Sequence, residues 1–283
     1  MLAKDTIEEY QGGLLQHGPY NDRIYLMRPP PLEKTTVEFP QQLLESAKRK
    51  GYSKIFAKVP EDAAADFLRA GFATEAEIPG FFSGRRAALF MASYLKNSRE
   101  QEDDLAVLKD ILHIAEDKRG TAVPPPDARF ILRPCTRQDV PVMAEIYRRT
   151  FASYPFPIYE EDYLLETMRS HVAYFGAEVD GALVALASAE MDREAANVEM
   201  TDFATLPEQA GNNLALHLLR LMEQAMQEEK IRTAYTIARA ASPAMNITFA
   251  RAGYCFAGRL KNNTNISGRI ESMNVWYKGI GKR

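Results

Sequence analysis

The sequence contains few of the residues that bind metal ions. It has 2 cysteines and 4 histidines among 283 residues. Cys135 and Cys255 do not form a C-x-x-C pair, and the histidines at positions 17, 113, 171 and 217 are scattered along the chain. Core or surface packing accounts for such isolated side chains, so the sequence predicts no metal site.

Long hydrophobic runs and an excess of one charge are also missing. The longer apolar stretches, such as 181–189, are far shorter than a membrane-spanning helix. The first ten residues include Asp5, Glu8 and Glu9, which are not typical of a signal peptide. The formal charge is −3, with basic and acidic residues interspersed, so no basic face for duplex binding is expected. We expect a soluble, cytoplasmic protein that binds neither nucleic acid nor membrane; its oligomeric state stays open.

Two common phosphate-binding patterns, G-x-G-x-x-G and G-x-x-x-x-G-K-[ST], do not occur in the chain. Residues 199–219 nevertheless predict a strand, a tight turn and a helix start: apolar alternation ends at Thr205, Pro207 closes the strand, and Gly211 precedes a leucine-rich run. The first N–H groups of a helix lack intrahelical partners, and its dipole is positive there. The turn is therefore predicted to bind an anion through the backbone, although an ordinary strand–turn–helix unit is the alternative.

Hydrophobic periodicity and turn residues predict an α/β chain in three parts. Because 46% of the 283 residues are hydrophobic, two domains can each bury a core. The predicted strands are 23–28, 55–59, a stretch from Phe72 onward, 87–95, 129–133, 173–179, 182–192, a run ending at Thr205, 234–238 and 274–277. The predicted helices are 39–50, 63–69, 100–117, 140–151, 161–170, 218–229 and 243–251. The proline-rich linker places a lobe at 1–99, a helix and linker at 100–127, and a second domain at 128–283.

The first and last parts of the chain contain the same short glycine-containing segments in the same order. Residues 69–72 (RAGF) correspond to 251–254 (RAGY), and the pair Gly84-Arg85 corresponds to Gly268-Arg269, in register with the flanking helices and strand. This pattern indicates an internal repeat. Prolines 29–31 stand where the first copy would need a phosphate-binding turn, so that copy is expected to be structural or to shape a partner or substrate site. An unrelated α/β lobe is the alternative.

The element order of residues 129–278, together with the turn at Gly211, resembles the GNAT superfamily of acetyl-CoA-dependent N-acetyltransferases. The family motif R-G-x-G-x-[GA] falls on Ala210, Gly211, Asn213 and Ala215, so its arginine and second glycine are replaced here. The resemblance implies an α/β GNAT fold: a mixed, mostly antiparallel central sheet with flanking helices. A smaller α/β lobe that resembles a truncated GNAT half would precede it.

The same resemblance implies acetyl-CoA as cosubstrate and assigns the residues that hold it. The strand before the turn is expected to separate from its neighbour and pair with the pantetheine arm. Asn246 matches a family asparagine, but the family's thiolate-protonating tyrosine is replaced by Phe249, which leaves Tyr254 or water for that step. The cofactor-binding residues implied in this way are Phe203, Ala204, Thr205, Ala210, Gly211, Asn212, Asn213, Leu214, Ala215, Asn246 and Phe249.

Four segments resemble the β-lysine N6-acetyltransferases within that superfamily: TFASYPFPI at 150–158, EMTDFATLP at 199–207, YTIARA at 235–240 and GRIESMNVWYK at 268–278. This resemblance implies acetyl transfer to the side-chain amine of β-lysine, which yields a zwitterionic osmolyte. The transfer needs a neutral amine, whereas a lysine-type ammonium has a pKa near 10.4, so a carboxylate or a water relay must accept a proton.

Glu199 is the favoured base and Asp202 is expected to hold a cationic group, although a surface or capping role is the alternative for either carboxylate. Their odd spacing places them on opposite faces of a regular strand. Tyr154 and Phe156 are expected to pack against the aliphatic chain of the substrate. The other candidate substrate-binding residues are Arg239, Asn263, Asn265 and Glu271.

The sequence favours direct attack of the amine on the thioester, with no covalent enzyme intermediate. A strand N–H such as that of Phe203 or Ala204 would polarise the thioester carbonyl. Two alternatives stay open at this point. The enzyme acetylates another diamine or a protein lysine, or the replaced motif residues leave a protein that binds acyl-CoA without turnover.

Overall fold

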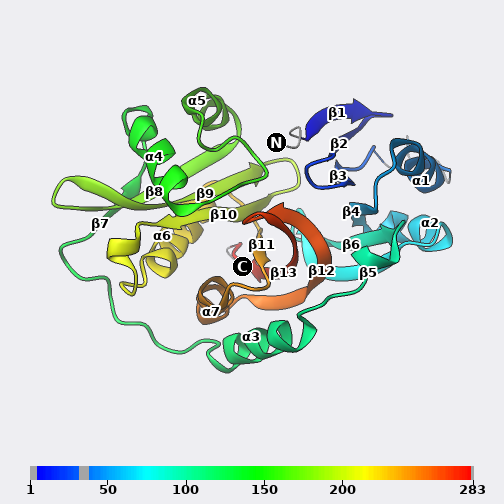
Figure 1. Cartoon of the computed structure of the whole chain (residues 1–283). Helices are drawn as coiled ribbons and strands as arrows, with labels where there is room; N and C mark the ends of the chain where they lie inside the picture. Colours follow the sequence, from blue (N-terminus) through cyan, green and yellow to red (C-terminus); the bar gives the residue numbers. More distant parts are fainter. Residues whose placement is uncertain (1–4, 32–37, 282–283) are drawn as a thin grey trace.

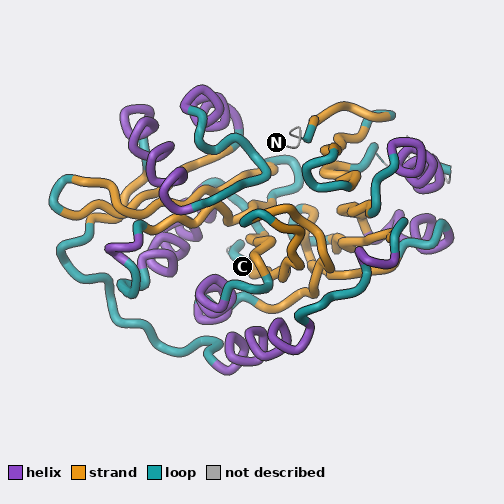
Figure 2. Tube along the Cα trace, in the orientation of Figure 1, coloured by secondary structure: helices purple, strands orange, loops and turns teal. Residues whose placement is uncertain are grey.

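The computed structural model describes residues 5–31 and 38–281. They form one 13-stranded sheet in the order β1-β2-β3-β4-β6-β5-β12-β13-β11-β10-β9-β8-β7, drawn in Figure 1 and, by secondary structure, in Figure 2. Among the described strands only the pairs β3–β4 and β10–β11 are parallel. The predicted α/β fold with a mixed, mostly antiparallel sheet is therefore confirmed.

The strands of the first half are β1 Thr6–Tyr10, β2 Gly13–Gly18, β3 Arg23–Arg28, β4 Lys54–Pro60, β5 Ala73–Phe82 and β6 Arg86–Tyr94. Those of the second half are β7 Ile131–Pro134, β8 Val172–Val179, β9 Ala182–Asp192, β10 Asn197–Thr205, β11 Thr233–Arg239, β12 Cys255–Ile266 and β13 Arg269–Gly279. The α-helices are α1 Phe39–Lys50, α2 Ala64–Arg69, α3 Leu105–Asp117, α4 Val140–Thr150, α5 Glu161–Ser170, α6 Leu214–Glu228 and α7 Pro243–Arg251. Within the described ranges, no helix has the length and apolar character needed to cross a membrane.

Alternation along β3 divides its side chains between two environments. Ile24 and Leu26 pack into the core beneath α1 and α2, whereas Arg23, Tyr25 and Met27 face the opposite side of the sheet. That opposite face does not meet solvent. It packs toward the second half of the chain in a shared core that includes Phe90, Leu260 and Val275. The first half therefore buries both faces of its sheet, one under its own helices and one against the other half.

Both halves have the same strand arrangement. In the first half, the parallel pair β3–β4 is followed by β6 and β5; in the second, the parallel pair β10–β11 is followed by β13 and β12. A helix joins the parallel strands in each case, α1 in the first half and α6 in the second. The corresponding strands β5 and β12 then pair with each other and join the halves into one sheet. Figure 1 shows this joint between the blue-to-cyan half and the green-to-red half.

Two sequence-based expectations about the first 120 residues were wrong or incomplete. The helix predicted at 100–117 begins at Leu105, because the preceding segment packs along β12 and β13. There Ser272 donates a hydrogen bond to the Glu102 carboxylate, whose nearer oxygen lies 4.0 Å from Arg259 Nη1. The strands β1 and β2 were not predicted at all. β1 is mostly exposed and lacks an apolar alternation, and β2, although mostly buried, has the sequence GLLQHG without alternation.

Gly258 allows β12 to approach β5 closely. Its φ is 147°, and a Cβ built there would lie 2.1 Å from the carbonyl oxygen of Glu75 and 2.6 Å from Ala76 Cα. Both neighbours are backbone atoms, which cannot move away as a flexible side chain can. The joint between the two halves therefore depends on a residue without a side chain.

Replacing Gly258 by alanine is expected to destabilise the protein by about 3 kcal/mol, because the added methyl group overlaps backbone atoms of β5. Thermal unfolding measures the loss. Gly279→Ala is the matched control, since nothing lies within 4 Å of a Cβ at that position, and it should change stability by less than about 0.5 kcal/mol. Equal unfolding temperatures for the two variants would show that the joint tolerates a side chain.

Candidate active site

The parallel strands β10 and β11 separate shortly after they meet. Only Asn197–Glu199 pair with Thr233–Tyr235. Beyond Glu199, β10 stays paired with β9, and β11 stays paired with β13. The edges of β10 and β11 that face each other are therefore no longer hydrogen-bonded. The separation expected from the family resemblance is present. It leaves backbone N–H and C=O groups available for a bound chain with amide groups.

The turn after β10 leads directly into α6. Gly211 and Asn213 have positive φ values of 87° and 55°, and the helix begins at Leu214. Within the part of the chain that the structure describes, the N–H groups of residues 211–215 donate to no backbone carbonyl. Arg129 brings a guanidinium to this turn, with its Nη2 donating to Asn212 Oδ1 at 3.4 Å. Free N–H groups, a helix dipole and a nearby cation are suited to an anion, and we call residues 211–215 the anion-binding turn for this reason.

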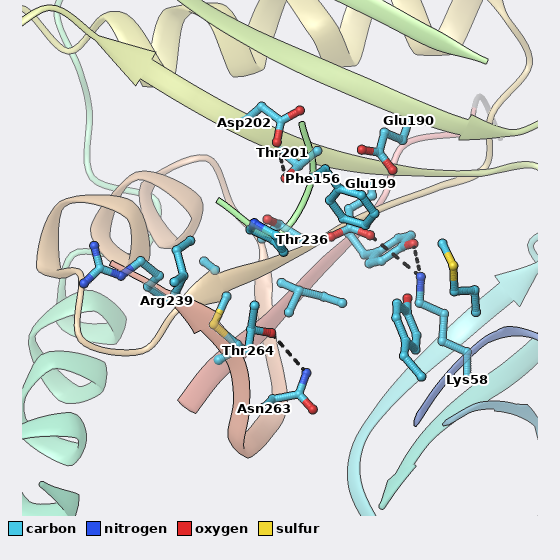
Figure 3. Close-up of a pocket in the computed structure, with 18 of the residues that line it drawn as sticks. Lys58, Phe156, Glu190, Glu199, Thr201, Asp202, Thr236, Arg239, Asn263 and Thr264 are labelled. Atoms are coloured by element: carbon cyan, nitrogen blue, oxygen red, sulfur yellow. Dashed lines mark hydrogen bonds and ion pairs between the residues drawn. The ribbon is translucent and has the colours of Figure 1, made fainter. Parts of the chain in front are cut away.

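A cavity of about 480 Å³ lies beside the separated strands, and both halves of the chain line it. The second half contributes residues of β9, β10, β11 and β12 and the aromatic side chains Tyr154 and Phe156. The first half contributes the inward-facing side chains of β3 and β4, among them Arg23, Tyr25 and Lys58. Figure 3 shows Glu190, Glu199 and Asp202 on one side of this space and Lys58 and Asn263 on others.

Glu199 and Asp202 line the same cavity, so the expectation that they face opposite sides of the strand was wrong. The register of β10 against β9 shifts between Thr201 and Ala204, and Asp202 has a φ of 54°. This β-bulge adds a residue to one strand and breaks the strict alternation of side chains. As a result, two carboxylates with odd spacing reach one site.

Hydroxyl groups hold the Asp202 carboxylate in place. Ser188 Oγ donates to its Oδ2 at 2.6 Å, Tyr154 Oη donates to its Oδ1, and Thr201 Oγ1 lies 3.4 Å from the same Oδ1. Burial raises the pKa of Asp202, and the hydroxyl donors oppose that rise. Because its oxygens are already engaged, Asp202 is better suited to orient Tyr154 and to add negative potential than to accept a proton.

Glu199 contacts a lysine from the other half of the chain. Lys58 Nζ lies 3.7 Å from Glu199 Oε2 and donates a hydrogen bond of 2.8 Å to Tyr235 Oη. The ammonium group also lies over the rings of Tyr25 and Tyr235, at 5.4 and 5.0 Å from their centroids. Burial raises the pKa of Glu199, while the positive charge of Lys58 opposes the rise. The first half of the chain thus helps to set the charge of the candidate base.

Glu190 is a third carboxylate that the sequence interpretation missed. It pairs with Glu199 in the β9–β10 register, so the two side chains lie next to each other on one face. Burial, reinforced by the negative charges of Asp202 and Glu199, raises the pKa of Glu190 to about 8. The available signal was its position as the one charged residue among 182–191 of an otherwise apolar strand.

Several predicted site residues do not meet the cavity. Asn246 is fully buried and joins α7 to the sheet: its Nδ2 donates to Ser242 O, and its Oδ1 accepts from Asn274 and Trp276. Phe249, in contrast, lines the cavity and packs between Phe203 and Tyr254. Tyr254 itself is fully buried and does not line the cavity, so the structure does not place its hydroxyl near a leaving thiolate.

The candidate substrate residues divide in the same way. Arg239 lines the cavity, but its Nε and Nη2 each donate to the Glu271 carboxylate at 2.8 Å. Its charge is therefore already paired, and Glu271 itself lies outside the cavity. Asn265 donates to Tyr20 O and is also outside, where it ties β12 to the first half. Asn263, Tyr154 and Phe156 do line the cavity. The sequence interpretation missed Arg23, Tyr25, Lys58 and Tyr235, because their place at the site depends on contacts between the halves.

Comparisons with known proteins agree with this geometry. The family model described as "Acetyltransferase (GNAT) family" matches residues 140–254, which include β10, the anion-binding turn and β11. The chain is 36% identical over 274 residues to a β-lysine N6-acetyltransferase of Methanococcus maripaludis, covering 97% of this chain and 98% of that protein. It is 32% identical over 246 residues to the same-named protein of Methanosarcina mazei, covering 80% and 90%.

One of the solved structures with a similar fold is the ribosomal-protein-S18-alanine N-acetyltransferase of Escherichia coli. Its TM-score is 0.48 at 16% identity, and the match covers 54% of this chain and 96% of that one.

Proposed function

The chain belongs to the acetyltransferase (GNAT) family, and we propose that it transfers the acetyl group of acetyl-CoA to the side-chain amine of β-lysine. Two relatives of that name align over 97% and 80% of the chain, which includes both halves of the sheet. The single structural observation that carries the proposal is the acidic cavity beside the separated strands. A diamino acid presents two ammonium groups, and Glu190, Glu199 and Asp202 supply carboxylates to meet them.

The residues around the separated strands fit acetyl-CoA. The free N–H groups at 211–215 would hold the diphosphate, with Arg129 contributing charge in place of the missing motif arginine. The inner edge of β10 around Phe203, Ala204 and Thr205 would pair with the pantetheine amides. When bound, the cosubstrate supplies an activated acyl thioester. The chain's own contribution is then to position the amine, accept its proton and exclude water.

Glu199 accepts the proton of the acceptor ammonium, either directly or through one water molecule, and the neutral amine then attacks the acyl carbon. A main-chain N–H of Phe203 or Ala204 donates to the carbonyl oxygen as charge develops on it. Neither cysteine lines the cavity as the structure describes it, which supports direct attack without an acyl-enzyme. Water takes the role of thiolate acid, because Tyr254 lies away from the cavity and Phe249 has no ionisable group.

We further propose that residues 1–99 form a substrate-shaping half, residues 100–127 a connection, and residues 128–283 the acetyltransferase domain. The first half supplies one wall of the acceptor cavity through β3 and β4. Prolines 29–31 follow β3 at the position where the second half has its anion-binding turn. If the first half shapes the acceptor site and the second half binds acetyl-CoA, the first half needs no cosubstrate site of its own.

Purified protein, acetyl-CoA and a panel of amines test the proposed function, with thiol release as the readout. Turnover of β-lysine with little turnover of polyamines or lysine peptides is the expected result. Comparable turnover across the panel would replace β-lysine by a broader class of acceptor. Binding of CoA without turnover of any amine would indicate a protein that senses acyl-CoA.

Asn213 provides a test of the anion-binding turn. Its φ is 55°, a conformation that β-branched residues strongly disfavour. Asn213→Val is expected to bind CoA about tenfold more weakly. Asn213→Gly restores the residue of the family motif and should bind at least as tightly as the parent chain. Titration calorimetry with CoA makes the measurement, and identical affinities for both variants would place the diphosphate elsewhere.

Glu199→Gln tests the assigned base through its pH dependence. Glu199 works as a carboxylate, and because its pKa is raised, kcat/KM of the parent enzyme should rise with pH through that raised value and then level off. The glutamine variant should lose about 10²- to 10⁴-fold near neutral pH and recover in part at alkaline pH, where the free amine is neutral without help. Glu116→Gln, on the exposed face of α3, is the control. A uniform loss at every pH would remove Glu199 as the base.

Lys58→Met tests whether the first half sets the charge of Glu199. Without the ammonium at 3.7 Å, the pKa of Glu199 should rise further, so the rising limb of kcat/KM should move to higher pH and the neutral-pH rate should fall by about tenfold. In the double variant with Glu199→Gln, the Lys58 change should add little, because its partner is already neutral. Additive losses with an unmoved pH profile would instead indicate that Lys58 only packs.

A further inference from the structure

A buried arginine lies in the cavity wall that the first half supplies. Arg23 of β3 is 4% exposed, and its guanidinium carbon lies 5.2 Å from the centroid of the Tyr25 ring and 5.9 Å from that of Phe56. Burial lowers its pKa to about 10, which still leaves it positively charged at neutral pH. Among residues 5–31 and 38–281, no carboxylate forms an ion pair with it. Asp5 and Glu75 are near enough to raise this pKa but do not contact the guanidinium. A buried charge without a contacting counter-ion is costly, and a bound carboxylate would offset that cost.

The hydrogen bonds of this guanidinium are incomplete. Nη1 donates to Asn263 O and, at 3.3 Å, to Thr264 Oγ1, both on β12. Nε is buried and has no acceptor in the described chain, and Nη2 makes no bond to a described residue. The neighbouring Asn263 also has a buried Oδ1 without a donor. The bonds to β12 fix the plane of the guanidinium and leave Nη2 for a ligand in the cavity.

The other cations of the cavity wall differ from Arg23. Arg239 forms a two-bond pair with Glu271, and Lys58 is engaged by Glu199 and Tyr235. Arg28, at the end of β3, is exposed to solvent and does not share the desolvation of Arg23. Desolvation is what makes an arginine selective for a bound carboxylate, because the charge pair is not screened by water.

We propose that Arg23 binds the carboxylate of the acceptor amino acid, which makes it the residue that distinguishes a diamino acid from a polyamine. The inference rests on the proposed function and adds the orientation of the substrate. Carboxylates line the cavity beside the separated strands, and Arg23 lies with β3 on the wall from the first half. A zwitterionic acceptor with its reactive ammonium at the acidic side and its carboxylate at Arg23 matches this polarity. A polyamine would leave Arg23 unpaired, and its cationic end would meet like charge there.

A pair of matched substrates isolates the carboxylate. 1,4-Diaminopentane is β-lysine without its carboxyl group, with both amines retained at the same spacing. For the parent enzyme, β-lysine should be strongly preferred. In Arg23→Met, KM for β-lysine should rise about 10- to 100-fold with little change in kcat, because a charge-assisted hydrogen bond to the substrate is lost. The parameters for 1,4-diaminopentane, measured as a substrate or as a competitive inhibitor, should stay within about twofold or improve.

Two further variants separate recognition from folding. Arg99→Met is the control, because Arg99 is likewise buried with unpaired Nε and Nη2 atoms but lies outside the cavity. It should lower the unfolding temperature without changing the preference between the two substrates. Arg23→Lys keeps the charge but loses the planar fork, so it should keep part of the preference for β-lysine and give a result even where the methionine variant does not fold.

The outcomes distinguish this inference from the function on which it rests. No turnover of β-lysine by the parent enzyme would overturn the proposed function itself. Turnover by the parent enzyme, combined with equal losses for both substrates in Arg23→Met and Arg23→Lys, would overturn the assignment of Arg23 and leave the function intact. A loss confined to the substrate that carries the carboxylate would support both.

Discussion

The structure depends on the separation of β10 and β11 after three residue pairs. A parallel pair that stayed together would satisfy its own backbone groups and leave nothing for a ligand. Because β10 keeps β9 as a partner on its other edge and β11 keeps β13, the separation costs only the inner row of hydrogen bonds. The same separation makes room for the cavity and directs β10 into the anion-binding turn. One change in strand pairing therefore accounts for both the proposed thioester site and the proposed acceptor site.

The separation also explains the use of the second half-sheet. An opening in the middle of a sheet exposes apolar side chains and carboxylates to water unless something covers them. The first half provides that cover: its β3 and β4 face the opening, and its edge strand β5 joins β12 so closely that Gly258 has no space for a side chain. The two halves have the same strand order, and the anion-binding turn described above belongs to the second. Under the proposed function, the first unit would serve substrate recognition and the second would hold the cosubstrate.

The sequence predicted the elements whose information is local. Short-range turn chemistry and periodicity predict the helix that ends at Gly51, the hairpin at Asp180-Gly181 and the turn at Gly211. The structure has all three where they were expected. A family resemblance supplied the acetyl-donor side of the site. The bulge at Asp202 was not predictable. Strict alternation is the correct default for a strand, and the residue types at 201–203 (TDF) do not indicate an extra residue. Counting from Glu199 to Asp202 therefore gave the wrong face.

The residues that were missed share a different cause. Lys58 and Arg23 look like ordinary charges near the ends of short apolar strands, and their meaning depends on a partner more than 100 residues away: Tyr235 for Lys58 and Asn263 for Arg23. Their distance in sequence hides them from any reading of local pattern. Conversely, Asn246 was assigned to the cofactor from a motif position, and the structure gives its side chain five partners inside the fold. Motif positions locate a site well, but hydrogen-bond partners decide what each residue there does.

The acidic side of the cavity sets the last constraint. Three carboxylates that share one buried site cannot all ionise without a cation, because each negative charge raises the pKa of the others. Lys58 lies 3.7 Å from Glu199 and Ser188 donates to Asp202, whereas the pKa of Glu190 is raised to about 8, which favours its protonated form at neutral pH. An ammonium that enters beside Glu190 favours its ionised form, so binding of the acceptor and loss of a proton from the wall are coupled. Under the proposed function, the charge of the whole acidic wall, rather than that of one residue, would therefore recognise the two ammonium groups.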